Sequence, residues 1–303
     1  MKKRKHHYVW RNYLRPWAST EIIFCLRKGK IFETNLMGIG QRRDFYRLKE
    51  LNADDFVFIK KFAIDASPQH LQKLHENLIK QFSFIFSLKD FLKSKGVNDP
   101  KINEQIDIAI SNLEEDLHTH IEGSAIKYIE YILKEDIDFY RTDEGCLNFV
   151  YYLCVQYMRT QKMKASVLSN VSGIKSIYVE KIWNVLSHIL AINFGWSLYR
   201  DRKKFKMVLL KNTSSKEFIT GDQPVINTYA TGGSKPSPPD KLELYYPVSP
   251  FLAILITEKE IYKGINKVVL EEKEVFSYNE LMVRNSHEQI YGTSKSVLED
   301  YKH

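Results

Sequence analysis

The sequence predicts an α+β fold with a central α-helical bundle, an N-terminal β-hairpin and a C-terminal, mostly antiparallel sheet that pack together. Three observations predict it: β-prone runs flank a glycine turn near the N-terminus, amphipathic segments fill the middle, and β-branched and aromatic residues dominate after residue 194. The chain has 303 residues. We therefore expect one large domain, 1–303, with a hairpin region (1–66), a helical region (67–193) and a β-rich region (194–303).

The N-terminal region is expected to contain a hairpin. Residues 21–34 (EIIFCLRKGKIFET) hold two short β-prone runs around a four-residue turn, RKGK, which includes Gly29. Residues 38–51 follow as a glycine-containing connection into a short strand. Strands therefore come before the first helix.

The middle of the chain predicts a bundle of four helices, because apolar side chains recur there every three or four positions. The helices are expected at residues 67–96, 101–137, 143–164 and about 174–192. Ser67 is expected to cap the first helix, with Pro68 in its first turn. Gly123 is a candidate break in the second helix.

The C-terminal region predicts a sheet, since turn residues separate runs of β-branched and aromatic residues. Strands are expected within residues 196–200, 204–212, 217–229 and 242–258. Residues 230–241 are dense in Gly, Ser and Pro, which predicts an exposed loop. A last helix at about 278–286 and a short strand around 289–292 complete this region.

Composition excludes several classes of protein. Hydrophobic residues make up 44% and charged residues 27%, which is typical of a folded globular chain. No apolar run is long enough to span a membrane and no secretory signal is present, so we expect a cytoplasmic protein with no membrane partner. The three cysteines, Cys25, Cys146 and Cys154, form no CxxC pair, which predicts buried thiols. The absence of a Walker loop excludes P-loop nucleotide hydrolysis.

Positive charge is concentrated at the N-terminus. Residues 1–50 hold thirteen Lys and Arg against four Asp and Glu, whereas residues 101–140 hold ten acids against three bases. Such asymmetry is typical of a phosphate-binding surface, and a solvated surface without a ligand is the alternative. The candidate nucleic-acid-binding residues are Lys2, Lys3, Arg4, Lys5, Arg11, Arg15, Arg202, Lys203 and Lys204.

Four polar side chains stand where chemistry could occur. His7, in a basic segment, is a candidate general acid or base. Gln156 and Arg159 are three apart in an otherwise apolar helix, so Arg159 forms a structural ion pair or presents its guanidinium to a phosphate or carboxylate. Asp222 lies at the end of a predicted strand, where it either serves a function or bonds its own turn.

His118 raises the question of a metal site. His118 and His120 are two apart, so on a helix their rings point in nearly opposite directions and cannot share an ion. His118 and Glu122 are four apart and could share a ligand, with a surface hydrogen-bonded pair as the alternative. No metal ligand is assigned from the sequence, and a divalent cation remains open as a cofactor.

Ordered motifs across the chain resemble one family. The opening HHYVWRNYLRPWA resembles the HxVPxxYLxxF opening of the family called domain of unknown function 4238. FITGDQPV and YPVSP resemble its FxTSDxPV and PLSP segments, in the same order. DFY, IEGSA, QYMRT, Trp196 and YNEL resemble further landmarks between and after them. The chain departs from the pattern at Trp10, where the family has proline.

The resemblance implies a set of landmark residues without implying an activity. It implies a bacterial or phage-associated cytoplasmic protein that is suspected of a role in defence or toxicity. The polar landmarks it gives are His7, Glu122, Gln156, Arg159 and Asp222. The framework landmarks are Tyr13, Leu14, Tyr46, Trp196, Pro224 and Pro250.

If these polar residues meet in space, phosphodiester cleavage is the reaction that uses them best. His7 would act as general acid or base, Arg159 would stabilise charge on phosphorus, and Asp222 would orient the histidine or bind a divalent ion. Glu122 and Gln156 complete this predicted catalytic set. A metal-free site needs the 2′-hydroxyl as nucleophile, which favours RNA over DNA as the partner. The hypothesis is therefore an RNase-type phosphodiesterase of a bacterial defence or toxin system.

Three alternatives remain open. A non-catalytic nucleic-acid-binding or regulatory protein would use the same basic surface. An enzyme acting on a small nucleotide-like ligand would keep the pocket without binding a polyanion. The polar landmarks could also form a buried structural network. A protein partner or a homo-oligomer is compatible with each of these readings.

Overall fold

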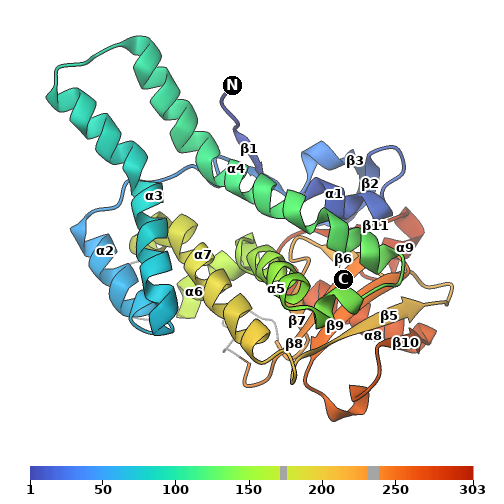
Figure 1. Cartoon of the computed structure of the whole chain (residues 1–303). Coiled ribbons are helices and arrows are strands. Elements are labelled where there is room, and N and C mark those ends of the chain that lie inside the picture. Colours follow the sequence, from blue (N-terminus) through green and yellow to red (C-terminus); the bar gives the residue numbers. More distant parts are fainter. Residues whose placement is uncertain (171–175, 231–238, 303) are drawn as a thin grey trace.

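The structure is a computed structural model that describes residues 1–170, 176–230 and 239–302. Most helices gather on one side of the molecule and the larger sheets on the other, and the long helix α4 (Pro100–Leu133) runs from one side to the other (Figure 1). The predicted α+β class is confirmed, because helices α3 to α7 occupy the middle of the sequence, with small sheets formed by strands before them and a mixed sheet formed by strands after them.

The predicted hairpin is confirmed as β2 (Ile22–Arg27) and β3 (Lys30–Asn35). Its turn has two residues rather than the four that were predicted. Lys28 and Gly29 both adopt the left-handed conformation, with φ of 51° and 71°, and this geometry matches the twist of the flanking strands.

The hairpin is completed by strands from the other end of the chain. β2 pairs with β11 (Ile290–Gly292), and β11 pairs with β6 (Thr220–Gly221), so the sheet order is β3-β2-β11-β6. A separate two-stranded sheet joins β1 (Lys5–His7) to β4 (Gln41–Arg43). In the sequence between β1 and β4, the chain also forms α1 (Arg11–Leu14) and the short 3-10 helices Arg15–Trp17 and Leu36–Gly38.

The central helices differ from the prediction in several details. They are α2 (Ala53–Ile59) with a π-helical turn (Lys60–Ile64), α3 (Gln69–Ser94), α4, the 3-10 helix Asp138–Arg141, α5 (Asp143–Met158), α6 (Gln161–Asn170) and α7 (Ser176–Arg200). α2 was not predicted, although Asn52 and Asp55 form a capping box at its start. α4 continues through Gly123 without a break. Within the described ranges, no helix is long and apolar enough to cross a membrane.

Three further expectations for the helices are wrong. The helix expected at 143–164 is divided in two, because the Thr160 side chain accepts from the Met163 amide and starts α6. The strand expected at 196–200 is the last turn of α7, where Trp196 packs against His70 of α3 and tertiary contact overrides β propensity. Ser67 does not cap α3, because its hydroxyl donates to the Ala63 carbonyl.

The C-terminal sheet has the order β10-β5-β9-β8-β7 and is antiparallel except for the β10–β5 pair. Its strands are β5 (Lys206–Asn212), β7 (Ile226–Asn227), β8 (Glu243–Ser249), β9 (Leu252–Thr257) and β10 (Lys267–Leu270). The remaining elements are the 3-10 helix Glu260–Tyr262, α8 (Glu272–Asn285) and α9 (Lys295–Glu299). The strand expected at 217–229 is two short strands, β6 and β7, in different sheets. Most of the loop expected at 230–241 lies outside the described residues.

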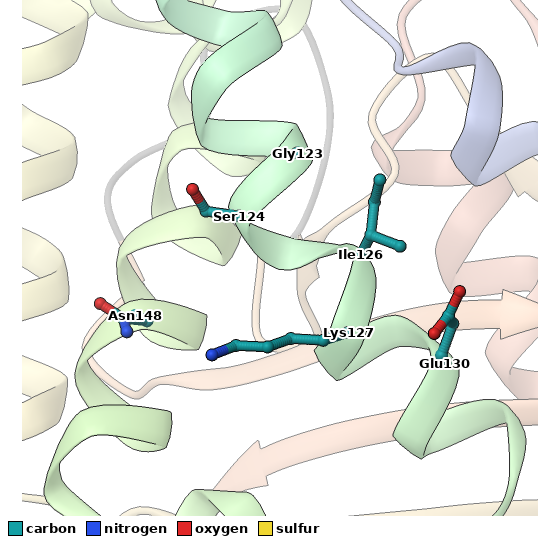
Figure 2. Close-up of a pocket in the computed structure, with 6 residues that line it drawn as sticks. All are labelled: Gly123, Ser124, Ile126, Lys127, Glu130 and Asn148. Carbon is teal, nitrogen blue, oxygen red and sulfur yellow. The ribbon is translucent and has the colours of Figure 1, made fainter.

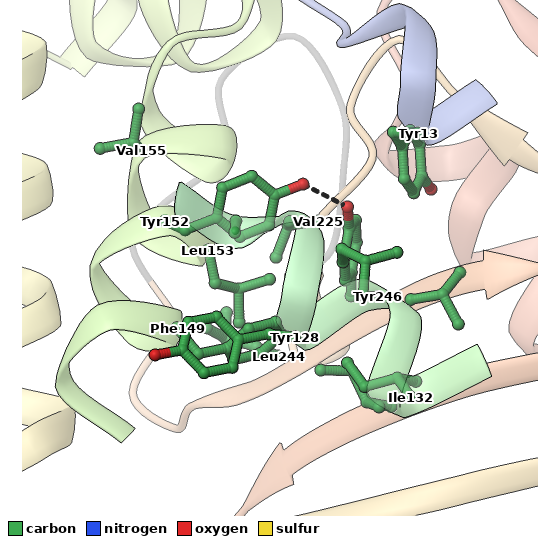
Figure 3. Packing of buried hydrophobic residues seen from close by; sticks show 14 of the residues in the cluster. Tyr13, Tyr128, Ile132, Phe149, Tyr152, Leu153, Val155, Val225, Leu244 and Tyr246 are labelled. Carbon is green, nitrogen blue, oxygen red and sulfur yellow. Dashed lines mark hydrogen bonds between the residues drawn. The ribbon is translucent and has the colours of Figure 1, made fainter. Parts of the chain in front are cut away.

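Aromatic side chains join the helical and β-rich halves (Figure 3). The ring of Tyr13 stacks on that of Tyr246 in β8, with the centroids 4.9 Å apart. The Tyr246 hydroxyl lies 2.8 Å from the hydroxyl of Tyr152 in α5, and the two form a hydrogen bond. Trp17 is buried beside them, and its Nε1 donates to the Phe218 carbonyl. The core is therefore continuous from α1 through α5 to β8.

Removing the hydroxyl of either Tyr152 or Tyr246 should lower the free energy of unfolding by more than half of the loss caused by removing both. Tyr246→Phe leaves the Tyr152 hydroxyl without its partner, so we expect the free energy of unfolding to fall by about 1–2 kcal/mol. The double variant removes both hydroxyls and should cost less than the sum of the two single changes. Urea unfolding of the wild type, both single variants and the double variant measures this, and strictly additive costs would contradict the prediction.

Candidate functional site

Arg159 is the one Lys or Arg side chain that is buried within the described ranges, with 1% of its surface exposed. It follows the last turn of α5, and its Nη2 donates to Oε1 of Glu122 on α4 over 2.6 Å. Its Nε and Nη1 are buried and have no hydrogen-bond partner among the described residues. Unsatisfied N–H groups on a buried cation are costly. Arg159 therefore has capacity for a further acceptor.

The N-terminal strand and α4 bring His7 and Glu115 beside this arginine. The Glu115 carboxylate lies close to the main chain of His7. Burial raises the pKa of Glu115 to about 7, and the charge of Arg159 opposes that rise. Burial lowers the pKa of His7 to about 4, assisted by the charges of Arg11 and Arg159. His7 Nε2 and Glu115 Oε2 are buried, and neither has a partner in the part of the chain that the structure describes.

Gln156 lies one helical turn before Arg159, and it is buried with an unpartnered Nε2 among the described residues. The sequence-predicted residues His7, Glu122, Gln156 and Arg159 are therefore brought to one region. We call His7, Glu115, Glu122, Gln156 and Arg159 the Arg159 cluster.

Asp222 makes its hydrogen bonds outside the Arg159 cluster. Its carboxylate accepts the backbone N–H groups of His287 (2.7 Å), Glu288 (2.8 Å) and Gln289 (3.1 Å). Burial raises the pKa of Asp222, and these bonds oppose the rise. No contact in the described part of the chain joins Asp222 to His7, so the expected orientation of the histidine by this carboxylate is not found. The alternative that Asp222 bonds its own turn is also wrong, because its carboxylate holds a turn 65 to 67 residues further along the chain.

A second polar group lies on the neighbouring face of α4. Nε2 of His118 is 3.6 Å from Oε1 of Glu114, and Nε2 of His188 on α7 is 3.4 Å from the same oxygen. All three residues are buried. The carboxylate beside His118 is that of Glu114, four residues earlier on α4. Glu122, four residues later, bonds Arg159 instead, so the expected pair of His118 and Glu122 does not form. His120 is exposed whereas His118 is buried, so the two rings do not share a site.

Tyr46 lies between the two polar groups. Its ring is buried against the ring of His118, with the centroids 4.4 Å apart. Burial raises the pKa of Tyr46, and the charge of Arg159 opposes this. Its hydroxyl is buried without a partner among the residues that the structure describes. Tyr46 thus contacts His118 and lies near the charge of Arg159.

The predicted nucleic-acid-binding residues are mostly engaged in ion pairs. The two basic clusters lie at opposite ends of the molecule, the first near the N-terminus and the second where α7 leads into β5 (Figure 1). Lys5 and Lys203 have no ion pair among those described. The pairs are Lys2–Asp107, Lys3–Asp116, Arg4–Asp44, Arg11–Glu21, Arg15–Glu21, Arg202–Asp143 and Lys204–Glu258.

An open groove is lined mainly by residues of α4 that follow Glu122 in the sequence. Figure 2 shows its lining residues, which come from α4 and from Asn148 of α5. Its volume is about 570 Å³. It contains none of the predicted catalytic residues, and Lys127 and Glu130 are its only ionisable side chains. The groove therefore offers no catalytic set of its own.

Sequence reasoning missed Glu114, Glu115 and His188. Glu115 lies seven residues before Glu122, so a helix places the two on one face, and this spacing could have identified it. His188 is one of several polar residues in the predicted helix at about 174–192, and nothing in the sequence indicates that it faces Glu114. Only the packing of α7 against α4 reveals that contact.

These features define an α+β protein with a buried arginine, carboxylates and histidine held among α4, α5 and the N-terminal strand. The family model described as Protein of unknown function (DUF4238) matches residues 5–296, and the chain belongs to this family. The resemblance seen in the motifs is thereby confirmed. No curated protein and no solved structure matches the chain.

Asp222→Asn should destabilise the fold without removing a secondary-structure element. The asparagine amide turns at least one acceptor into a donor that faces backbone N–H groups, so we expect a loss of about 1–3 kcal/mol in the free energy of unfolding. Glu288→Gln, at an exposed position of the same turn, is the matched control. Equal stability of the two variants in urea unfolding would disprove this role.

His7 should make stability depend on pH. Its pKa is about 4 in the folded chain, against an ordinary value of 6.5. As pH falls from about 6.5 to 4, the unfolded chain takes up a proton that folded His7 does not, and stability is lost across this window. We expect His7→Gln to lose less stability than the wild type between these pH values. Melting temperatures across the range measure this, with His120→Gln as control, and parallel curves for wild type and His7→Gln would contradict it.

Proposed function

We propose that the protein cleaves a phosphate ester of a nucleotide-like substrate at the Arg159 cluster. The observation that carries this proposal is the buried guanidinium of Arg159, whose Nε and Nη1 have no partner among the described residues. Glu122 satisfies only one of its nitrogens. A phosphate supplies anionic oxygens that such donors bind with strong, charge-assisted hydrogen bonds.

The surrounding side chains support acid–base chemistry on that phosphate. His7 is in its neutral form at neutral pH and its Nε2 is unpartnered in the described structure, so this nitrogen is free to accept the proton of an attacking hydroxyl or water oxygen as that oxygen bonds phosphorus. The bond from phosphorus to the leaving oxygen breaks, and this oxygen takes a proton from the carboxyl of Glu115. Arg159 stabilises the charge that develops on the non-bridging oxygens, and Gln156 donates through Nε2.

Two observations favour a small substrate over a long nucleic acid. The Arg159 cluster is largely buried, which suits a ligand that enters the protein. Most of the basic residues that would hold a polyanion are already paired with carboxylates, and their clusters lie at opposite ends of the fold. RNA cleavage, the first expectation from the sequence, becomes one arm of the test. We also propose that this activity serves bacterial defence or toxicity.

The test compares variants of one helix and one strand. Wild type, His7→Gln and Glu115→Gln are incubated with bis(4-nitrophenyl) phosphate, mono-, di- and cyclic nucleotides, total RNA and plasmid DNA. His120→Gln and Glu130→Gln, both exposed on α4, are matched controls. We expect kcat/KM to fall by about 100-fold or more in the two cluster variants, and to stay unchanged in the controls. Melting temperatures recorded in the same buffers show whether each variant is folded.

The outcomes separate the hypotheses. Cleavage of nucleotides that depends on His7 and Glu115 supports the proposal. Salt-sensitive cleavage of RNA alone would replace the small substrate by an RNase function. No cleavage by the wild type, or full activity in folded His7→Gln, would reject a catalytic role for the cluster.

A further inference from the structure

We propose that Glu114, His118 and His188 bind a divalent transition-metal ion, with Zn²⁺ as the simplest case. We call these three residues the histidine–carboxylate cluster. Two helices supply it: α4 gives Glu114 and His118 at an i, i+4 spacing, and α7 gives His188. This inference is independent of the proposed function, because it concerns a different set of side chains and is tested by metal binding.

The separations of the ligand atoms fit an ion better than they fit hydrogen bonds. The two imidazole nitrogens lie 3.6 and 3.4 Å from the same Glu114 oxygen, and all three ligand atoms are within 4.8 Å of one another. A good N–H···O bond is shorter, at about 2.7–3.2 Å. A tetrahedral ion with ligands at roughly 2.0–2.2 Å separates any two of them by about 3.3–3.6 Å.

The imidazoles also lack other partners. Both ring nitrogens of His118 and Nε2 of His188 are buried, and none has a hydrogen-bond partner among the described residues. A network built only for stability would be expected to satisfy these atoms. Two histidines and one carboxylate form a ligand set that suits Zn²⁺ or Fe²⁺, whereas Mg²⁺ and Ca²⁺ prefer oxygen ligands.

The surroundings hold the three ligands in place. Asn184 of α7 donates to the second oxygen of Glu114 over 2.5 Å, which orients the carboxylate and leaves Oε1 facing the histidines. The ring of Tyr46 packs on His118, and the ring of Phe82 lies 5.7 Å from that of His188. Asn184 also lines a small cavity with Ser83 and Lys181.

The test measures metal binding by the full-length chain after treatment with a chelator. Isothermal titration with Zn²⁺ gives affinity and stoichiometry, Co²⁺ absorption reports the coordination geometry, and Mg²⁺ is the negative probe. We expect one ion per chain, a rise in melting temperature with Zn²⁺, and Co²⁺ bands of a nitrogen and oxygen site without a thiolate band. Elemental analysis of the protein as purified identifies any ion that it retains.

Variants locate the ion. We expect His188→Gln and Glu114→Gln to bind Zn²⁺ more than about 100-fold more weakly, beyond the loss typical of an outer-shell change. His75→Gln is the matched control, because His75 is a buried histidine on α3 that bonds Asn193 outside the cluster. Wild type that binds no Zn²⁺ or Co²⁺ overturns the proposal without any variant. Binding that persists at full affinity in folded His188→Gln overturns it as well.

Discussion

The burial of ionisable side chains along α4 is the constraint on which the helical half of the molecule depends. Glu114, His118 and Glu122 are buried on this one helix. A buried charge is costly unless another element supplies a partner. α5 supplies Arg159, and α7 supplies Asn184 and His188. These requirements fix which helices must lie against α4 and in which register.

The position of the N-terminal strand also depends on α4. Its first residues lie along α4, where Lys3 receives a hydrogen bond from Ser111 and its amide donates to Asn112. The cations of this segment meet carboxylates of α4, as in the pair Lys2–Asp107. Each exposed pair contributes little by itself, but several of them share one strand. The strand then continues directly to His7, which is how a residue near the chain terminus reaches the side chain of Arg159.

Local signals in the sequence were enough for the hairpin, the long helices and most of the strands. The lysine–glycine turn and the apolar periodicity of α3 and α4 can each be recognised from residues that are close together in the sequence. The helical conformation of Trp196 was not predictable, because its contact with His70 comes from a different helix. The partners of Asp222 lie 65 to 67 residues along the chain, so its role in holding a turn has no local signature.

Some residues of the candidate site could likewise be predicted from local sequence, whereas their partners could not. Arg159 and Gln156 were found because polar residues in an apolar helix need partners, and Glu122 was found through the family motif. The partner of Arg159 could not be known before α4 and α5 were placed. The opposite charges of the first fifty residues and of residues 101–140 suggested a surface for nucleic acid, yet part of that charge is paired between the two segments, in Lys2–Asp107, Lys3–Asp116 and Arg47–Asp107. Charge asymmetry along a sequence can therefore reflect ion pairs between two parts of one chain. The buried N–H donors of Arg159 that lack a partner among the described residues are better evidence for a ligand-binding site.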